Sequence, residues 1–224
     1  MVDLLTQKEI VYRKIKEGIL NSEWVPGTKL VERELCEKLR VSRTPIREAF
    51  NRLESEGLLE RMPRWSAFVK KPDRAEIMEM YEVREALEGV AARLAVLRAT
   101  PDDLNKMKEA IDKTEQALAK EGGEDVKAYN QGDNEFHEAL VNASHNRKLI
   151  NLASLGHLHV EEIPVALDVK PIEEHGRLVE DHRCILASVT ERNGELAEKL
   201  IRKHISGAMK GAARFFDESA NKEA

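Results

Sequence analysis

The sequence predicts a protein dominated by α-helices, with a small N-terminal unit of three helices and a β-hairpin followed by an antiparallel helical bundle. Three observations lead to this fold class. Aromatic residues make up only 4% of the 224 residues, which disfavours a β-sandwich. Strong helix formers such as Ala, Leu, Glu, Lys and Arg are abundant, and apolar residues recur mainly at helical spacing. Patterns typical of strands occur only before residue 72.

The N-terminal unit, residues 1–71, contains three helical patterns and then two short strand patterns. The predicted elements are helices at 7–20 and 31–39, a strand at 28–30, a third helix from Thr44, and hairpin strands at 58–62 and 67–71. Thr44 is suited to be the N-cap of the third helix, with Pro45 at its first position, and Gly57 is a natural end. Three helices with a short break before the third, followed by a hairpin, are typical of a winged helix-turn-helix.

Strand patterns disappear after residue 74, and helical patterns separated by short breaks follow one another. These helices are predicted at 74–98, 101–119, 124–143, 146–160, 172–191 and 193–217. Short connections place consecutive helices antiparallel, so we expect a helical bundle over residues 74–217. The polar residues 218–224 are expected to form a disordered tail.

Charge is distributed unevenly along the chain. The whole sequence carries a formal net charge of -5, but residues 1–72 carry 15 Lys and Arg against 11 Asp and Glu. A mildly basic first unit on an acidic second unit suits a protein of which only the first unit approaches phosphates. Cys36 and Cys184 lie far apart and no apolar run approaches 18 residues. We therefore expect a reduced cytoplasmic protein with no membrane contact.

The third helix of the N-terminal unit carries the first set of candidate functional residues. Arg43, Arg47 and Asn51 recur at four-residue spacing, opposite the apolar stripe of the helix. An α-helix fits the DNA major groove, where outward arginines reach guanine edges or phosphates, and Arg64 in the following hairpin adds a second basic element. The alternative is an ordinary solvated face, because glutamates such as Glu48 alternate with the arginines.

Several strings in this unit resemble the DNA-binding domain of GntR-type bacterial regulators, over nearly all of residues 8–70. They are Pro26-Gly27 with Leu30, Glu32 and Leu35, then VSRTPIREA at 41–49, Arg52-Leu53, and EGL at 56–58. The resemblance implies sequence-specific binding of operator DNA by a homodimer, with contacts from Arg33, Arg43, Thr44 and Arg47. One recognition helix per subunit predicts inverted-repeat half-sites. The sequence departs from the family at Trp65-Ser66, where the wing tip usually has glycine.

The second set of candidate residues lies in the predicted bundle. Asp133 and His137 are four residues apart, which places a carboxylate and an imidazole on one face of one helix. His182 and His204 lie on two later helices, and a bundle can bring side chains from three helices together. One carboxylate with up to three imidazoles suits Zn, Ni, Mn or Fe, and not Ca. The alternative is solvated or core histidines, since the chain has seven.

The bundle also resembles the C-terminal domain of FadR-type GntR regulators. The strings are REALE at 84–88, Asp133 with Phe136, His137 and Leu140, Asn146 with Leu149, His182 with Ile185 and Ser188, and Ala197 with His204. The resemblance implies a divalent metal, with zinc preferred, held by Asp133, His137, His182 and His204 beneath a cavity for a small carboxylate effector. Arg84 is suited to capture that carboxylate, and an ion pair with Glu88 is the alternative.

These observations together predict a ligand-responsive transcription regulator that is not an enzyme. Two alternatives use the same Asp and His residues: a metal-dependent hydrolase, in which the metal activates water, and a metal sensor that needs no organic ligand. The sequence contains no HExxH, no GxSxG and no P-loop motif. A winged N-terminal domain would also be unexplained in a hydrolase.

Overall fold

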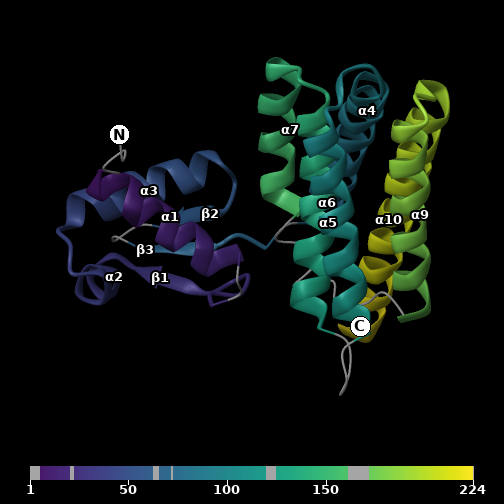
Figure 1. Ribbon diagram of the computed structural model, residues 1–224. Helices are drawn as coiled ribbons and strands as arrows, with labels where there is room; N and C mark the ends of the chain where they lie inside the picture. The colour runs from purple at the N-terminus through teal and green to yellow at the C-terminus, as the bar shows by residue number, and fades with distance from the viewer. Residues whose placement is uncertain are drawn as a thin grey trace. The chain divides into compact units, whose positions relative to one another are not determined.

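The computed structural model describes residues 6–20, 23–62, 66–71, 73–119, 125–160 and 172–223. The chain divides into two compact units, residues 1–73 and residues 74–224 (Figure 1). This division lies next to the one predicted from the loss of strand patterns. Each unit has its own apolar core, and within the described residues no helix is long and apolar enough to cross a membrane.

The N-terminal unit is a winged helix-turn-helix, as the sequence predicts. Its elements are α1 (Gln7–Leu20), β1 (Lys29–Val31), α2 (Glu32–Leu39), α3 (Arg43–Ser55), β2 (Leu59–Met62) and β3 (Ser66–Val69). The three strands form an antiparallel sheet in the order β1-β3-β2. The predicted apolar stripe of α3, formed by Ile46, Phe50 and Leu53, is fully buried, so the opposite side of that helix faces outward.

The start of α3 lies two residues earlier than the predicted N-cap implies. The helix begins at Arg43, with Ser42 in extended conformation as its N-cap, and no side chain caps it. The prediction of Thr44 as N-cap is therefore wrong. Pro45 is still in the first turn, where its missing N–H costs no intrahelical hydrogen bond, and this is why the proline is compatible with either start.

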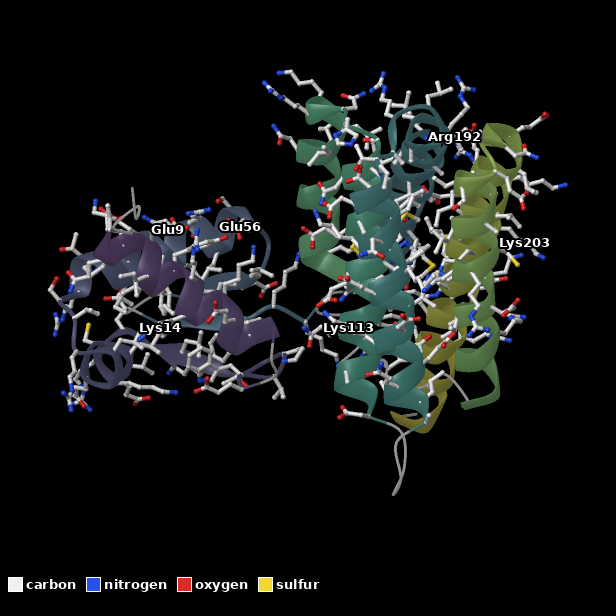
Figure 2. The ribbon with its side chains drawn as sticks, viewed as in Figure 1. Glu9, Lys14, Glu56, Lys113, Arg192 and Lys203 are labelled. Carbon is white, nitrogen blue, oxygen red and sulfur yellow. The ribbon has the colours of Figure 1, made fainter. Side chains whose placement is uncertain are left out.

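A polar network fixes α1 on α3 and so orients the outward face of α3. Arg52 on α3 donates to Glu9 of α1 (2.9 Å) and to Glu56 (3.2 Å); Figure 2 labels both glutamates. The Tyr12 hydroxyl also donates to Glu56, and the Arg52 guanidinium lies 3.6 Å from the centre of the Tyr12 ring. Burial, together with the neighbouring Glu56, raises the pKa of Tyr12. The tyrosine therefore stays neutral and keeps its donor.

The second unit is a helical bundle with the predicted order of helices. They are α4 (Arg74–Arg98), α5 (Pro101–Leu118), α6 (Val126–Ala143), α7 (Arg147–Val160), α9 (Ile172–Thr190) and α10 (Gly194–Glu223). Helix α10 packs along α4 and α9, and α5 packs along α6 (Figure 1). The core between them is built mainly from small and branched apolar side chains.

Two local features define α5 and its contact with α6. Thr100 caps the N-terminus of α5 in a capping box, in which Thr100 Oγ1 accepts from the Asp103 N–H and Asp103 accepts from the Thr100 N–H. Farther along α5, Thr114 lies against Gly132 of α6. The two helices are so close there that a β-carbon on Gly132 would lie 2.4 Å from Thr114 Oγ1. This close approach brings the next residue of α6, Asp133, into the bundle.

The end of the chain differs from the prediction. Residues 218–224 were expected to form a disordered tail, whereas α10 continues through them as far as Glu223. Glu, Ala and Lys make up most of this segment and favour helix, and extending an existing helix costs much less than nucleating a new one. Polar composition alone therefore misplaced this boundary.

Candidate metal centre

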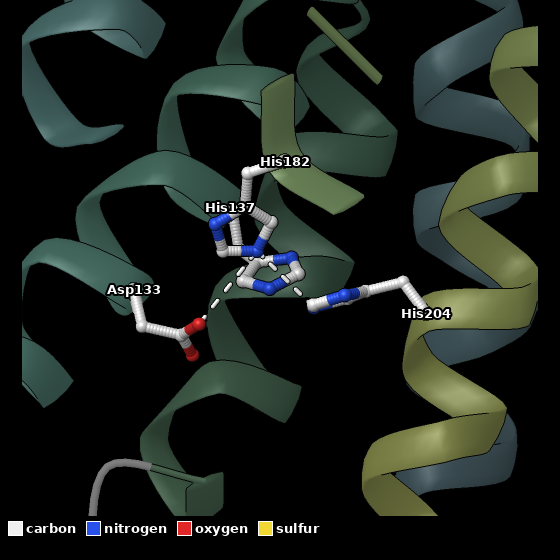
Figure 3. A group of neighbouring side chains, drawn as sticks. All are labelled: Asp133, His137, His182 and His204. Atoms are coloured by element: carbon white, nitrogen blue, oxygen red, sulfur yellow. Dashed lines mark hydrogen bonds and ion pairs between the residues drawn. The ribbon is translucent and has the colours of Figure 1, made fainter. Parts of the chain in front are cut away.

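Four polar side chains from three helices converge inside the bundle. Asp133 and His137 lie one turn apart on α6, His182 comes from α9 and His204 from α10. One ligand atom from each lies within 4.8 Å of all the others, and Figure 3 shows the four side chains gathered around one point. The three histidines are buried and Asp133 is partly exposed. The structure thus brings together all four residues that the sequence and its resemblance singled out.

The distances within this cluster fit a shared cation. The Nε2 atoms of His182 and His204 lie 3.1 Å apart, and His182 Nε2 lies 3.6 Å from Asp133 Oδ1. Two neutral imidazole nitrogens at this distance repel each other unless one carries a hydrogen or both share a cation. The ring of Phe136 stacks on His182 with centroids 3.9 Å apart and holds that imidazole in place. The donor set therefore fits a divalent metal such as zinc.

Burial favours the neutral, metal-binding form of these imidazoles. It holds the pKa of His182 well below its usual range, and the nearby His204 lowers it further. Burial also lowers the pKa of His137, as does the positive charge of Arg84. The imidazoles of His137 and His182 are therefore uncharged at neutral pH. Neutral nitrogen is the form that binds metals.

Glu88 on α4 fixes the orientation of His137. Its Oε2 lies 2.5 Å from His137 Nδ1, and both side chains are buried. An ionised carboxylate only accepts, so Nδ1 carries the hydrogen and Nε2 keeps its lone pair. A carboxylate behind a histidine is the usual outer support of a metal ligand. Sequence reasoning missed this contact because it depends on how α4 packs against α6, and spacing along the chain gives no signal of it.

Arg84 lies one turn before Glu88 on α4. Together, Arg84, Glu88 and His137 form a buried chain of hydrogen-bonded groups. Its Nε donates to Glu88 Oε1 over 2.5 Å, so the ion pair that the sequence offered as one alternative is present. Its Nη2 is buried and has no hydrogen-bond partner within the described residues. One donor of the guanidinium is thus available to an acceptor such as a carboxylate.

The residues predicted to contact DNA occupy different positions on the N-terminal unit. Arg33, Arg43 and Thr44 are exposed on α2 and α3. Arg47 is only 34% exposed, and its Nε donates to the buried carboxylate of Glu32 at 3.0 Å. The outward placement expected for Arg47 is therefore wrong in part, because Glu32 on α2 holds the guanidinium. Arg64 and Trp65 of the wing tip lie outside the described residues.

Sequence reasoning also passed over Arg61, on strand β2 of the wing. This arginine reaches back to α3, where its Nη2 lies 3.5 Å from the carbonyl oxygen of Arg47 and its Nε lies 3.8 Å from Glu54. It therefore adds a positive charge beside α3. Strand β2 has only four residues, Leu59–Met62, which is too short for a pattern in the sequence to show where Arg61 points.

Family comparisons agree with both units. Residues 7–69 match the model of bacterial regulatory proteins of the gntR family, and residues 79–207 match the FCD domain, which is the FadR-like C-terminal domain. The chain belongs to the GntR family of bacterial transcription regulators. The prediction of a GntR regulator with a FadR-like second domain is confirmed.

Individual relatives of this GntR regulator cover nearly its whole length. It is 30% identical to the uncharacterized HTH-type transcriptional regulator YdhC of Bacillus subtilis, over 87% of this chain and 86% of the relative. It is 28% identical to the Uxu operon transcriptional regulator of Escherichia coli, over 90% and 84%. Among solved structures, Escherichia coli McbR/YncC has the same fold, with a TM-score of 0.83 at 22% identity, over 95% of this chain and all of that one.

Proposed function

We propose that this GntR regulator binds operator DNA as a homodimer and that a divalent metal and a small carboxylate in its FCD domain change its affinity for the operator. The observation that carries the proposal is the convergence of Asp133, His137, His182 and His204 in a bundle joined to a winged helix-turn-helix. Relatives that are named transcriptional regulators support regulation over hydrolysis as the task of this site.

In this proposal Arg33, Arg43, Thr44 and Arg47 contact the operator, and Arg64 reaches it from the wing. Arg43 lies at the start of α3 with its side chain exposed, so it is the best placed of these to reach a base edge. Arg43→Ala should cost about 1–3 kcal/mol of specific binding, measured by fluorescence anisotropy on a selected operator. Lys14→Ala, an exposed cation on α1, is the matched control. Equal losses in both variants would contradict base reading by Arg43.

The metal is proposed to be held by Asp133, His137, His182 and His204, with zinc preferred and nickel, manganese or iron as alternatives. When bound, the cation supplies a positive charge and an open coordination position for an acidic ligand. His137 is held by Glu88 and His182 by the ring of Phe136, so little ordering is needed on binding. Neutral imidazole is the binding form, and burial holds the pKa of His137 and His182 below the ordinary histidine value of about 6.5. Metal affinity should therefore weaken only as pH falls below about 6.5.

A small carboxylate is proposed as the effector. The support is Arg84, whose buried Nη2 has no hydrogen-bond partner in the described part of the chain and which is coupled through Glu88 to His137. A guanidinium donor and a metal together suit an anionic ligand better than a neutral one. Such a ligand would act on the same buried chain of groups that orients the metal ligand.

The test first measures what the protein binds and how many subunits it has, and then measures whether an added acid changes its affinity for the operator. Native mass spectrometry of protein taken from cells should give two subunits, one metal per subunit and any retained acid. Operator affinity should then change by about 5–150-fold with one member of a panel of two- to six-carbon hydroxy, keto and sugar acids. If metal alone changes operator affinity and no acid adds to it, the protein is a metal sensor. If neither metal nor any acid that binds changes operator affinity, the regulatory role of this site is wrong.

A further inference from the structure

The two ring nitrogens of His204 have different surroundings. Its Nε2 lies 3.1 Å from His182 Nε2, within the cluster that Figure 3 shows. Its Nδ1 is buried and makes no hydrogen bond within the described residues. The Oδ2 atom of Asp181, on the neighbouring helix α9, lies 3.5 Å from this Nδ1. A carboxylate therefore lies behind His204, slightly farther away than an ordinary hydrogen bond allows.

A metal bound to Nε2 of His204 would determine where the hydrogen of this imidazole lies. A neutral imidazole carries one hydrogen, so a lone pair used at Nε2 leaves the hydrogen on Nδ1. A buried N–H without an acceptor is unfavourable, and in His204 this cost would oppose metal binding. A carboxylate that accepts the hydrogen bond removes the cost and makes the imidazole a stronger ligand.

The same arrangement is already formed at another proposed ligand. Glu88 Oε2 lies 2.5 Å from His137 Nδ1 and connects α4 to α6, whereas Asp181 lies on α9 behind a ligand on α10. In both cases the two helices pack against each other. His182 differs, because the ring of Phe136 stacks on it and its buried Nδ1 has no hydrogen-bond partner in the described part of the chain. The cluster thus has one formed carboxylate support and one that is nearly formed.

The position of Asp181 on α9 suits a support. It directly precedes His182, and successive side chains of an α-helix point about 100° apart, so the two residues face different partners. His182 Nε2 lies near Asp133 and near His204 Nε2, whereas Asp181 lies near His204 Nδ1. The Asp181 side chain is 35% exposed, and a carboxylate that keeps contact with water stays ionised at neutral pH.

We propose that Asp181 is a positioning residue of the metal centre, whose carboxylate accepts the Nδ1–H of His204 when Nε2 of that histidine binds the cation. The inference rests on the metal of the proposed function and adds a second outer support beside Glu88. Helix α9 then contributes twice to the centre, with His182 as a ligand and with Asp181 as the support of a ligand on α10.

The first experiment measures zinc affinity by competitive chelator titration of the full chain after the metal has been removed. Asp181→Ala should weaken zinc binding about 10–100-fold, as expected for the loss of an outer support. Asp181→Asn keeps the size of the side chain and a neutral acceptor oxygen, so its loss should be smaller but measurable. It also carries the test if the alanine variant does not fold, which circular dichroism of the metal-free proteins shows.

Glu180→Ala is the matched control. It removes the same charge from the adjacent residue of α9, where the Glu180 side chain is 63% exposed and pairs with Arg183. Its zinc affinity should stay within about 2-fold of wild type, because exposed ion pairs contribute little. Equal zinc affinity of Asp181→Ala and wild type would overturn the role of Asp181 and leave the proposed metal in place. A wild type that binds no zinc would remove both the metal of the proposed function and this inference.

The second experiment separates positioning from a general effect of charge. A residue that acts through His204 should lose its effect when that imidazole is absent. In a His204→Ala background, Asp181→Ala should therefore change zinc affinity by less than about 2-fold, measured by calorimetry in a double-mutant cycle. A loss in that background as large as the loss in the wild-type background would overturn the inference, because Asp181 would then act independently of His204.

Discussion

The two units of this GntR regulator each contain an arginine–glutamate ion pair, and the two pairs lie in opposite settings. In the winged unit, Arg47 is one third exposed and pairs with buried Glu32 across 3.0 Å. In the bundle, Arg84 and Glu88 are both buried, 2.5 Å apart, and Glu88 continues to His137. The first guanidinium remains within reach of a molecule outside the chain. The second serves a site inside it.

The residue types are the same in both pairs, so the burial of the charged groups is what distinguishes their roles. Charged residues of α3 whose function is proposed to be DNA contact stay near water, where phosphates can approach them. In the bundle, Arg84, Glu88 and His137 are buried and joined by hydrogen bonds from Arg84 to Glu88 and between Glu88 and His137. Such an arrangement is expensive to build and sensitive to the loss of any member.

The most direct comparison removes the carboxylate from each ion pair. Glu88→Gln should lower the free energy of unfolding by about 3–5 kcal/mol, because it leaves the Arg84 charge buried without its counter-ion. Glu32→Gln should cost less, about 1.5–3 kcal/mol, because the Arg47 guanidinium stays hydrated. Glu88→Gln should also weaken zinc binding about 10–100-fold, as expected for an outer support. Urea denaturation and competitive chelator titration measure both effects, and equal stability losses would refute the contrast.

Loss of a proposed ligand should abolish the metal site. His182→Ala should weaken zinc binding by more than about 100-fold, beyond the loss from an outer-shell group. His145→Asn is the control, because His145 pairs with Asp103 away from the cluster and has a φ of 48° that asparagine tolerates. Isothermal titration with zinc after dialysis against chelator gives the affinities. Retention of one tightly bound zinc in both variants would show that His182 is not a ligand.

The close approach of α5 and α6 can be tested by a single methyl group. Gly132→Ala should destabilise the protein by about 1–3 kcal/mol, because the added carbon would overlap Thr114, including its backbone nitrogen. Gly207→Ala on α10 meets no atom within 4 Å, so it should be neutral or slightly stabilising. Thermal melts of the two variants provide the comparison. A neutral Gly132→Ala would mean that the helices separate without cost.

The smallest expected effect concerns the cap of α5. Thr100→Ala should cost about 1 kcal/mol, because the Asp103 N–H loses its acceptor. Thr190→Ala, at the exposed end of α9, removes a hydroxyl that only back-bonds within its own helix, so it should change stability by less than about 0.5 kcal/mol. Chemical denaturation resolves such differences between matched variants. Equal changes in the free energy of unfolding for the two variants would show that the capping box does not stabilise the protein.

Most of the fold was predictable from the sequence, because helical periodicity and helix-ending residues are local signals. The bounds of α4 at residues 74 and 98 were predicted as observed, since Thr100-Pro101 ends one helix and begins another. Boundaries without such signals were not. The earlier start of α3, with Ser42 as its N-cap, and the continuation of α10 to Glu223 depend on weak differences in helix energy.

For the candidate site, the sequence by itself determined one thing firmly: Asp133 and His137 share a face, because four residues make one helical turn. The convergence of His182 and His204 on that face was one possibility for a bundle, and the family resemblance favoured it. The packing of α6 and α10 on α4, and of α9 on α4, α5 and α10, decided it. The contact of Glu88 with His137 and the partial burial of Arg47 had no sequence signal. Such contacts join residues distant in the chain, and their geometry is set by the packing of whole helices, which spacing along one helix cannot report.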